Sequence, residues 1–499
     1  MSRMPLCALL ASAAILHAAQ PIFIQNARVF DGVRMLPRSS LLIVGSKIEA
    51  VGSNLKAPAG SEVIDAAGMC LLPALIDAHA HIQSPADLKA ALTFGVGTYL
   101  DMFTLQPLAA AMRAEQQAGL GLDRADLRSA GTLVTAPGGH GTEYGVPIPT
   151  LAAAKDAQAF IVARIAEGSD YIKLIKDDGS AHNFHRATLD RETLAAAITA
   201  AHLRHKLAVV HIATAQDARE ALASGADSIA HIYAGPPDNA IAVQAAAQKV
   251  SWTPTLAVIT QGCTGPEQCA AALEIVRQLK AARVRILAGT DVPNPGTTHG
   301  ASLHSEMELL VRAGLTPVEA LAAATSEPAT AYGLIDRGRI APGFRADLLL
   351  VQGEPDHDIR TTRNIATVWK LGVRAARPVA VSSPGVVAAT ATSATRANFS
   401  GTWKLKETLT GTTPGGVREV VFIIEHRDPD FKYSASGKRN FNTAFTEAYD
   451  LTTDGRLPTD PAKVSMAGNW QGSALILSLY KDGKELMKSL SRNPPTASR

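Results

Sequence analysis

Residues 207–231 read LAVVHIATAQDAREALASGADSIAH, and this stretch predicts one complete strand–helix–strand unit. Two apolar runs flank an alanine-rich amphipathic segment that begins at Thr214 and closes at Gly225, a residue type that commonly ends helices. Each apolar run ends in a histidine, His211 or His231. Strands that are joined through helices favour a parallel sheet covered by those helices.

The same alternation continues over a long part of the chain. We expect strands at 71–77, 96–101, 131–135, 170–175, 207–212, 227–231, 251–255 and 285–290. They read as near-continuous apolar runs, as a parallel sheet covered on both faces requires. Eight strand–helix units in about 260 residues predict an α/β protein with a (β/α)8 TIM barrel. An open doubly wound sheet is the alternative.

Both flanks of the predicted barrel return to short strands. Residues 21–70 alternate in polarity and are broken by glycines, and strands reappear within 336–375. We expect the two flanks to join in one composite sheet. The sequence therefore divides into a composite β unit, 20–72 with 336–378, and a barrel, 73–335.

The two ends of the chain carry different signals. Residues 1–19, MSRMPLCALLASAAILHAA, have the layout of a signal peptide, with a buried first helix as the alternative. Residues 379–397 are uncharged until Arg396 and rich in Ser, Thr, Ala and Pro, which predicts a linker. Residues 398–499 alternate as strands and turns, so we expect a separate all-β unit.

Composition excludes several classes of function. The 499 residues are 46% hydrophobic with a net charge of +3 and 5% aromatic residues, which excludes global disorder and gives no support for nucleic-acid binding. We expect no transmembrane segment in the mature protein. A signal peptide implies an exported, periplasmic or secreted protein in an oxidising compartment. There Cys263 and Cys269 could pair within one loop, and two unpaired thiols are the alternative.

Ionisable side chains stand where the predicted strands end. Two histidines, His79 and His81, follow the first strand two residues apart and so point to the same side. The other strand ends or strands carry Lys173, His211, His231 and Asp291. Such groups are costly to bury without a partner, and a divalent cation such as Zn²⁺ resolves that cost. Active sites of barrels lie at this carboxyl end of the strands.

These segments resemble the amidohydrolase superfamily over about residues 20–380. The resemblance rests on LIDAHAH, YIKLI, VVHIATAQDAREALASGADSIAHI, ILAGTDVP and GRIAPGFRADLLLV. The chain is most similar to the imidazolonepropionase-related branch, which includes metal-dependent Xaa-Pro and Xaa-Arg/Lys dipeptidases. The resemblance implies a TIM barrel that carries a small β-sandwich built from both flanks.

The resemblance also implies two divalent ions, which we expect to be Zn²⁺. One ion would be held by His79, His81 and Asp291, and the second by His211 and His231. A hydroxide bridging the two ions would attack the substrate carbonyl. Asp291 would orient it, accept its proton and deliver that proton to the leaving nitrogen.

A lysine is implied as the bridge between the two ions. Lys173 would carry a carbamate formed with CO₂ on its amine, because an anionic bidentate group suits two cations and a free ammonium does not. Lys176 is a rival, since a strand covered on both faces has no periodicity that separates the two. The resemblance favours Lys173, and an ordinary salt-bridged lysine is the alternative.

The substrate residues are less well defined. His140 lies in a Gly-Gly-His-Gly loop similar to that of related dipeptidases, which implies contact with the substrate carbonyl or carboxylate; a turn-stabilising histidine is the alternative. Tyr144 and Tyr233 are expected to line the pocket, unless they only pack. No arginine clamp stands at a strand end, so Arg186 and Arg191 are interpreted as solvated helix-face residues.

The leading hypothesis is an exported binuclear amidohydrolase acting on a small molecule, a dipeptide or an N-acyl amino acid. Loop four, KDDGSAHN at 176–183, departs from the Gly-rich turn that the resemblance implies. This difference weakens the inference that the chain shares the substrate of those dipeptidases. A lactone, carbamate or phosphoester hydrolase is the alternative, and an imidazolone hydrolase is disfavoured because it would not need Lys173. A non-catalytic binding scaffold and a homo-oligomer are also left open.

The start of the last unit carries a weaker resemblance. Phe399-Ser-Gly401-Thr-Trp403 resembles lipocalin-like barrels, with a generic turn before a buried tryptophan as the alternative. The chain stops soon after Tyr480, which leaves few strands for a closed barrel. We therefore expect either a lipocalin-like accessory domain or an open sheet.

Overall fold

A computed structural model describes residues 20–376 except Asn183 and Thr264, together with the backbone of seven strands between residues 401 and 491. The chain divides into two compact units, Met1–Ala380 and Val381–Arg499. The expected signal peptide (1–19) and linker (379–397) lie outside the described residues. In the described part, no helix combines the length and the apolar character needed to cross a membrane.

Eight short strands of the first unit form two parallel sheets, β6–β7–β8 and β9–β10–β11–β12–β13. Their bounds are Leu75–Ala80 (β6), Val96–Asp101 (β7), Asp126–Ser129 (β8), Ile172–Lys176 (β9), Ala208–Ile212 (β10), Ser228–Ala230 (β11), Ser251–Thr253 (β12) and Arg285–Ile286 (β13). Within each sheet the strands are neighbours in chain order and pair in parallel. Outside these strands, Val134, after β8, makes a single parallel bridge with Leu174 of β9, and Val292, after β13, makes one with Ala80 of β6.

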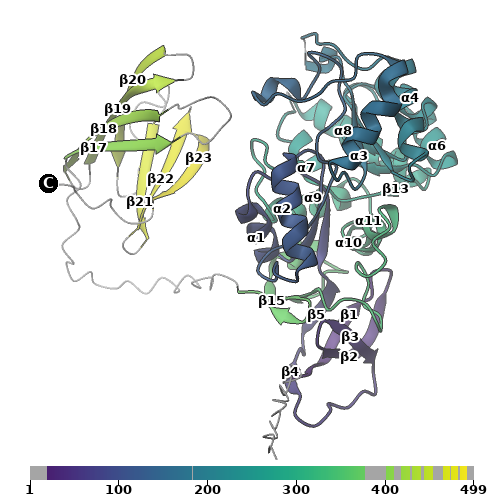
Figure 1. Cartoon of the computed structure of the whole chain (residues 1–499). Coiled ribbons are helices and arrows are strands. Elements are labelled where there is room, and N and C mark those ends of the chain that lie inside the picture. Colours follow the sequence, from purple (N-terminus) through teal and green to yellow (C-terminus); the bar gives the residue numbers. More distant parts are fainter. Residues whose placement is uncertain are drawn as a thin grey trace, which may run out of the picture. The chain divides into compact units, whose positions relative to one another are not determined.

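Helices follow the strands and cover them (Figure 1). Their bounds are Pro85–Thr93 (α1), Gln106–Gln117 (α2), Ala157–Ala166 (α3), Arg191–His202 (α4), Ala215–Ala223 (α5), Asn239–Ala247 (α6), Leu256–Ile259 (α7), Pro266–Ala281 (α8), Ala301–Arg312 (α9), Pro317–Ala323 (α10) and Ser326–Ala331 (α11). The helix start read from the sequence at Thr214 is confirmed. Thr214 and Thr316 each cap a helix in a capping box, and Pro317 occupies the first turn of α10.

Strands from both flanks form one eight-stranded sheet with the order β16–β15–β14–β5–β1–β2–β3, and β4 pairs with β1. Their bounds are Ile22–Phe30 (β1), Met35–Val44 (β2), Lys47–Gly52 (β3), Glu62–Asp65 (β4), Met69–Pro73 (β5), Leu348–Gln352 (β14), Ile365–Lys370 (β15) and Val373–Arg374 (β16). The junction is the antiparallel pair β5–β14, in which Leu71 lies opposite Leu350. Figure 1 shows the purple N-terminal strands and the green β15 in one region of this unit.

A buried ion cluster fastens this sheet to the barrel strands. Asp126, the first residue of β8, accepts from Lys370 Nζ at 2.6 Å, from Arg337 Nη1 at 2.6 Å and from Arg345 Nη1 at 2.9 Å. Burial alone would raise the pKa of Asp126, but the three cations outweigh it and hold that pKa well below its usual range. Asp126 is therefore charged at neutral pH, and its carboxylate pairs with all three cations.

Three expected strands have other bounds. The strand predicted at 131–135 is wrong, because β8 ends at Ser129 and a left-handed Gly131 (φ +63°) breaks the run. Of that stretch, Val134 makes the one bridge to β9. The run 71–77 belongs to two strands, β5 and β6, since apolar character continues across both. The run 285–290 contains only the two-residue strand β13.

The second unit is described by its strands alone. They are Gly401–Thr408 (β17), Val417–Arg427 (β18), Asp430–Arg439 (β19), Thr443–Thr452 (β20), Ser465–Gln471 (β21), Ala474–Lys481 (β22) and Lys484–Ser491 (β23). Each pairs with the next in antiparallel fashion, except β20 and β21, which pair in parallel. The sheet order runs from β17 to β23. The lipocalin-like assignment stays a prediction.

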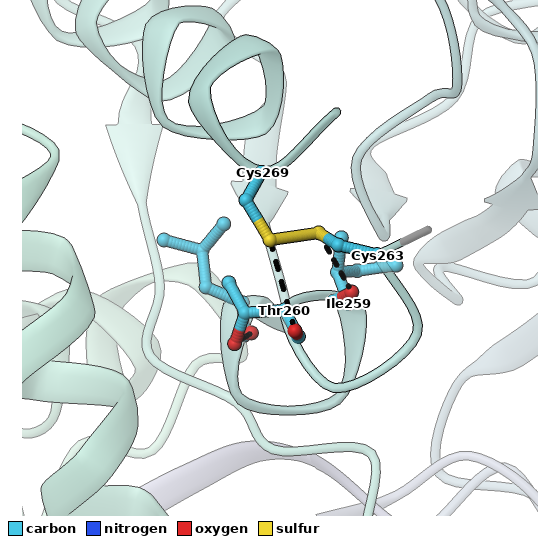
Figure 2. Close-up of a disulfide and its surroundings, with 5 residues drawn as sticks. Ile259, Thr260, Cys263 and Cys269 are labelled. Carbon is cyan, nitrogen blue, oxygen red and sulfur yellow. Dashed lines mark hydrogen bonds between the residues drawn. A yellow bond between two sulfur atoms is a disulfide. The ribbon is translucent and has the colours of Figure 1, made fainter. Parts of the chain in front are cut away.

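A disulfide joins Cys263, in the loop after α7, to Cys269 in the first turn of α8 (Figure 2). The two Cα atoms are 5.7 Å apart, within the usual range for a disulfide. The sulfur atoms lie 3.5 Å from the carbonyl oxygen of Ile259 and 3.7 Å from that of Thr260. Of the two alternatives left open by the sequence, the structure contains the bridge.

Removing this disulfide is expected to lower stability modestly. The bridge spans six positions, so loop-closure entropy in the unfolded chain gives about 2 kcal/mol, or about 3 °C in Tm for a unit of this size. Calorimetry of a Cys263→Ser/Cys269→Ser variant against the wild type measures this difference. A reductant should lower the Tm of the wild type and leave the variant unchanged. Equal Tm values under oxidising conditions would contradict the prediction.

Candidate metal centre

Three predicted ligands meet at the carboxyl ends of the first and last of the eight parallel strands, β6 and β13. His79 lies on β6, His81 follows it directly, and Asp291 lies beyond β13. Asp291 Oδ1 is 3.2 Å from His79 Nε2 and 3.0 Å from His81 Nε2. All three donor atoms lie within 4.8 Å of one another, so these residues form a candidate metal site. Two imidazoles and a carboxylate are a donor set that suits Zn²⁺ and similar ions.

Two more imidazoles extend this group. His231, after β11, has its ring centroid 4.6 Å from that of His79, and His211 on β10 is 4.5 Å from His231. His231 Nδ1 lies 4.0 Å from Asp291 Oδ2. Burial, together with the neighbouring charges, holds the pKa of His211 at about 4 and that of His231 well below its usual value. The neutral imidazoles keep a lone pair for a cation.

Three of the four histidines also contact a residue outside the group through a ring nitrogen, whereas His79 Nδ1 has no hydrogen-bond partner among the described residues. His81 Nδ1 is 3.3 Å from the Phe103 carbonyl oxygen, and His231 Nδ1 is 2.9 Å from Thr255 Oγ1. His211 Nε2 is 3.6 Å from Asp177 Oδ2, a residue that sequence reasoning missed. Such outer contacts orient metal-ligating histidines.

The geometry of His81 tests whether these residues fit a cation. A carbonyl oxygen only accepts, so His81 Nδ1 carries the proton and donates it to Phe103. In the neutral ring, Nε2 then turns a lone pair toward the Asp291 carboxylate 3.0 Å away. Two acceptors at this distance repel each other unless a proton or a metal ion lies between them. The donor set fits a divalent ion.

Two lysines on β9 have different surroundings. Lys173 is 2% exposed, and its Nζ has no hydrogen-bond partner among the described residues. Burial lowers the pKa of Lys173 to about 7, so much of the amine is uncharged near neutral pH. Lys176 instead donates to the Leu189 carbonyl at 3.0 Å and pairs with Glu220 at 2.8 Å. Lys176 thus has partners away from the candidate metal centre, whereas Lys173 has none among the described residues.

Two buried aspartates brace the strand ends, and neither was singled out in the sequence. Asp77 accepts from Thr290 Oγ1 at 2.7 Å and from the backbone N–H of His79 and Thr290. Asp101 accepts from Ser129 Oγ at 2.6 Å and from the Ile82 N–H at 3.1 Å. Burial raises the pKa of Asp77 to about 7 and that of Asp101 to about 6. Their positions at the ends of predicted strands were the signal that could have found them.

The backbone at the site is unusual. His231, Thr255 and Asp291 have φ values of 75°, 52° and 56°, in the left-handed region that residues other than glycine seldom occupy. Such conformations cost free energy and gather at functional sites. The turns aim two predicted ligands, His231 and Asp291, back over the strand ends.

His140 lies beside the imidazole group, as its loop suggested. Its ring centroid is 4.9 Å from that of His211, and its Nδ1 is 2.7 Å from Glu143 Oε1. Tyr144 is 56% exposed, stacks on Phe103 and lies with its hydroxyl 3.5 Å from His140 Nε2. Both side chains stand on the outer side of the candidate metal centre.

The other expected substrate residues lie elsewhere or differ. Tyr233 is 2% exposed and its hydroxyl accepts from the Asp238 N–H at 3.0 Å, which matches the packing alternative. Arg191 is exposed on α4, as expected. The interpretation of Arg186 as a solvated helix-face residue is wrong, because Arg186 precedes α4 and its Nη1 is 2.8 Å from His140 Nδ1.

A cavity of about 410 Å³ opens at the other end of the strands. Its lining includes Asp227, Ser251 and Arg285, which begin or precede β11, β12 and β13. The candidate ligands stand at the opposite ends of these strands. The cavity is therefore separate from the candidate metal centre.

Comparisons with known proteins bear on this site. A family model described as the amidohydrolase family matches residues 70–390. Imidazolonepropionase of Deinococcus radiodurans is 28% identical over 391 residues, which cover 70% of this chain and 95% of that protein. A crystal structure of a Xaa-Pro dipeptidase with methionine bound in its active site matches with a TM-score of 0.62 at 22% identity, over 71% of this chain and 99% of that chain. Molinate hydrolase matches with a TM-score of 0.62 at 17% identity, over 72% and 95%.

The two structural matches speak for the fold alone, because their sequence identity is low. Together with the family match, they imply a TIM-barrel-like α/β fold for the unit that holds the two parallel sheets. The matched residues include the whole candidate metal centre, from His79 to Asp291.

Proposed function

The chain belongs to the amidohydrolase family and is a hydrolase of carbon–nitrogen bonds, and from that premise we propose that it uses two divalent ions to cleave the amide bond of a dipeptide or an N-acyl amino acid. One observation carries the proposal. The carboxylate of Asp291 lies against His79 and His81. Two further imidazoles lie beside it, as does the buried Lys173, whose Nζ has no hydrogen-bond partner among the described residues.

Each side chain has a role in this proposal. His79, His81 and Asp291 would hold one ion, His211 and His231 the second, and Lys173 would bridge them as a carbamate. When bound, the ions polarise the substrate carbonyl and lower the pKa of the attacking water. We expect both ions to be Zn²⁺, because imidazole and carboxylate oxygen are its usual ligands.

The chain's own groups would move the proton and orient the substrate. Asp291 faces the imidazole group with both carboxylate oxygens, so it can accept a proton from water and pass it to the leaving nitrogen. His140 stands beside His211 and would bind the substrate on its outer side. No step needs a serine or cysteine nucleophile.

Metal removal combined with a substrate screen tests this proposal. Purified protein, metal-loaded or depleted with 1,10-phenanthroline, is assayed on dipeptides and N-acyl amino acids, with esters, lactones, carbamates and phosphoesters in parallel. We expect about two equivalents of metal, amide hydrolysis by the loaded protein, a loss of at least about 10²-fold on depletion, and recovery with Zn²⁺.

The outcomes separate the alternatives. Hydrolysis of lactones or phosphoesters with no amide turnover would contradict the proposed substrate class and favour the alternative hydrolase. Protein that holds no metal and turns over nothing would contradict an enzymatic role and favour a binding scaffold. One metal with full activity would contradict the binuclear site.

Export and a closed barrel belong to the same proposal. The Cys263–Cys269 bridge supports an oxidising compartment, in agreement with the signal-peptide layout of residues 1–19. The bridges Val134–Leu174 and Ala80–Val292 support closure of the eight strands into a (β/α)8 barrel. These two points do not affect the chemistry of the site.

A further inference from the structure

We propose that Arg186 recognises a free carboxylate on the substrate and so determines specificity. This inference rests on the proposed hydrolysis and names the residue that would select the substrate class. Arg186 lies in the loop that follows β9 and precedes α4.

The loop is folded so that Arg186 reaches the candidate metal centre. The Arg186 N–H donates to the Asp178 carbonyl at 2.8 Å, which closes the loop on itself. Gly179, with φ +78°, packs under Phe184, and a Cβ at this glycine would lie 2.5 Å from the Phe184 ring. A side chain at position 179 would thus open the loop.

The guanidinium of Arg186 is held by a ring contact on one face and by polar contacts at one nitrogen, Nη1. Its carbon lies 4.4 Å from the centroid of the Phe184 ring, a cation–π contact. Nη1 contacts Glu143 Oε1 at 2.5 Å and His140 Nδ1 at 2.8 Å. The side chain is 20% exposed, so the group is held in place and still reaches solvent.

The opposite edge of the guanidinium is available. In the described part of the chain, Nε and Nη2 of Arg186 donate no hydrogen bond, although these two N–H groups are parallel and match the two oxygens of a carboxylate. Glu143 balances the positive charge of the guanidinium. A fixed guanidinium with a free fork is suited to bidentate carboxylate binding, because little side-chain entropy is lost.

The spacing also fits a dipeptide or N-acyl amino acid. Arg186 contacts His140, whose ring is 4.9 Å from that of His211. In such substrates three bonds separate the scissile carbonyl carbon from the carboxylate carbon, a reach of about 4 Å. If the scissile carbonyl of such a substrate lay at the candidate metal centre, the substrate carboxylate would lie near the side chains around that centre, among them His140 and Arg186.

Paired substrates test the proposal. For the best amide substrate of the screen, kcat/KM is measured on the free acid and on its C-terminal carboxamide. We expect Arg186→Met to lower kcat/KM for the acid by about 10- to 100-fold, chiefly through KM, and to change the carboxamide less than threefold. Arg186→Lys should fall between, since it keeps the charge without the fork. Arg191→Met, at an exposed arginine nearby, is the matched control and should behave as wild type.

Other results would overturn the proposal. An equal loss on acid and carboxamide would mean that Arg186 only positions His140. No loss on either would remove Arg186 from the substrate site altogether. Metal content and Tm of each variant are compared with those of the wild type, so that a misfolded variant is recognised. If Arg186→Met misfolds, the kinetics of Arg186→Lys on the acid and the carboxamide test the proposal instead.

A binding measurement separates this failure from a failure of the proposed function. A panel of L-amino acids and their amides is titrated into metal-loaded wild type and Arg186→Met by calorimetry. We expect the acids to bind the wild type more tightly than the amides and to lose about tenfold in the variant. This preference needs no turnover. Its absence from the wild type would overturn the role of Arg186 whatever the enzyme hydrolyses.

Discussion

An Asp291→Asn variant is expected to lose about 10³-fold or more in kcat. General acid–base catalysis alone contributes about 10²- to 10⁴-fold, and this carboxylate also lies against His79 and His81. Asparagine has nearly the same shape but carries no charge and accepts no proton. The measurement is kcat with the best amide substrate in the presence of excess Zn²⁺, together with metal content.

Excess metal distinguishes the two roles of Asp291. If added Zn²⁺ restores both metal content and kcat, then Asp291 only binds the ion and the proton transfer assigned to it is refuted. Asp238→Asn is the matched control, because Asp238 caps α6 away from the site and asparagine caps helices equally well. The control should keep wild-type kcat.

Replacing Lys173 by Met is expected to remove at least one metal equivalent and to lower kcat/KM by about 10²-fold or more. The proposed carbamate would be the one ligand shared by both ions, and Lys173 Nζ has no other partner in the described part of the chain. Methionine keeps the length of the side chain and fills the same space. Metal analysis and kinetics of the same preparation measure the effect.

Lys176→Met is the matched control on the same strand. Lys176 is also buried, but it pairs with Glu220 and donates to the Leu189 carbonyl. The change should cost about 1–3 kcal/mol of stability and leave two metals in place. A Lys173→Met protein with two metals and full activity would refute the carbamate. The reverse pattern, with the loss in Lys176→Met, would move the role to the rival lysine.

The strands and the clustered ligands were the predictable part of this molecule. Apolar runs that end in His79, His211 and His231 indicate a parallel sheet with imidazoles at one edge, since parallel strands bring their carboxyl ends together. The runs could not give each strand's length. At 131–135 Leu133 and Val134 are buried, but only Val134 pairs with a strand.

The supporting shell was not predictable from local pattern. Asp177 and Thr255 hold His211 and His231 from distant positions, and no spacing rule links these pairs. The left-handed backbone at Asp291 could not be predicted, because the residue at this position is not a glycine. Arg186 looked like part of a helix, but it precedes α4 in a loop whose path depends on Gly179 and Phe184.

The candidate metal centre draws its ligands from the first and the last of the eight strands. His81 and Asp291 are 210 positions apart, and Asp77 ties Thr290 to the same place. An ion held by His81 and Asp291, as proposed above, would link segments from the first and the last of these strands, so its binding energy would favour the folded chain. Because His81 and Asp291 lie 210 positions apart, this set of ligands is complete only after the chain has been synthesised through Asp291.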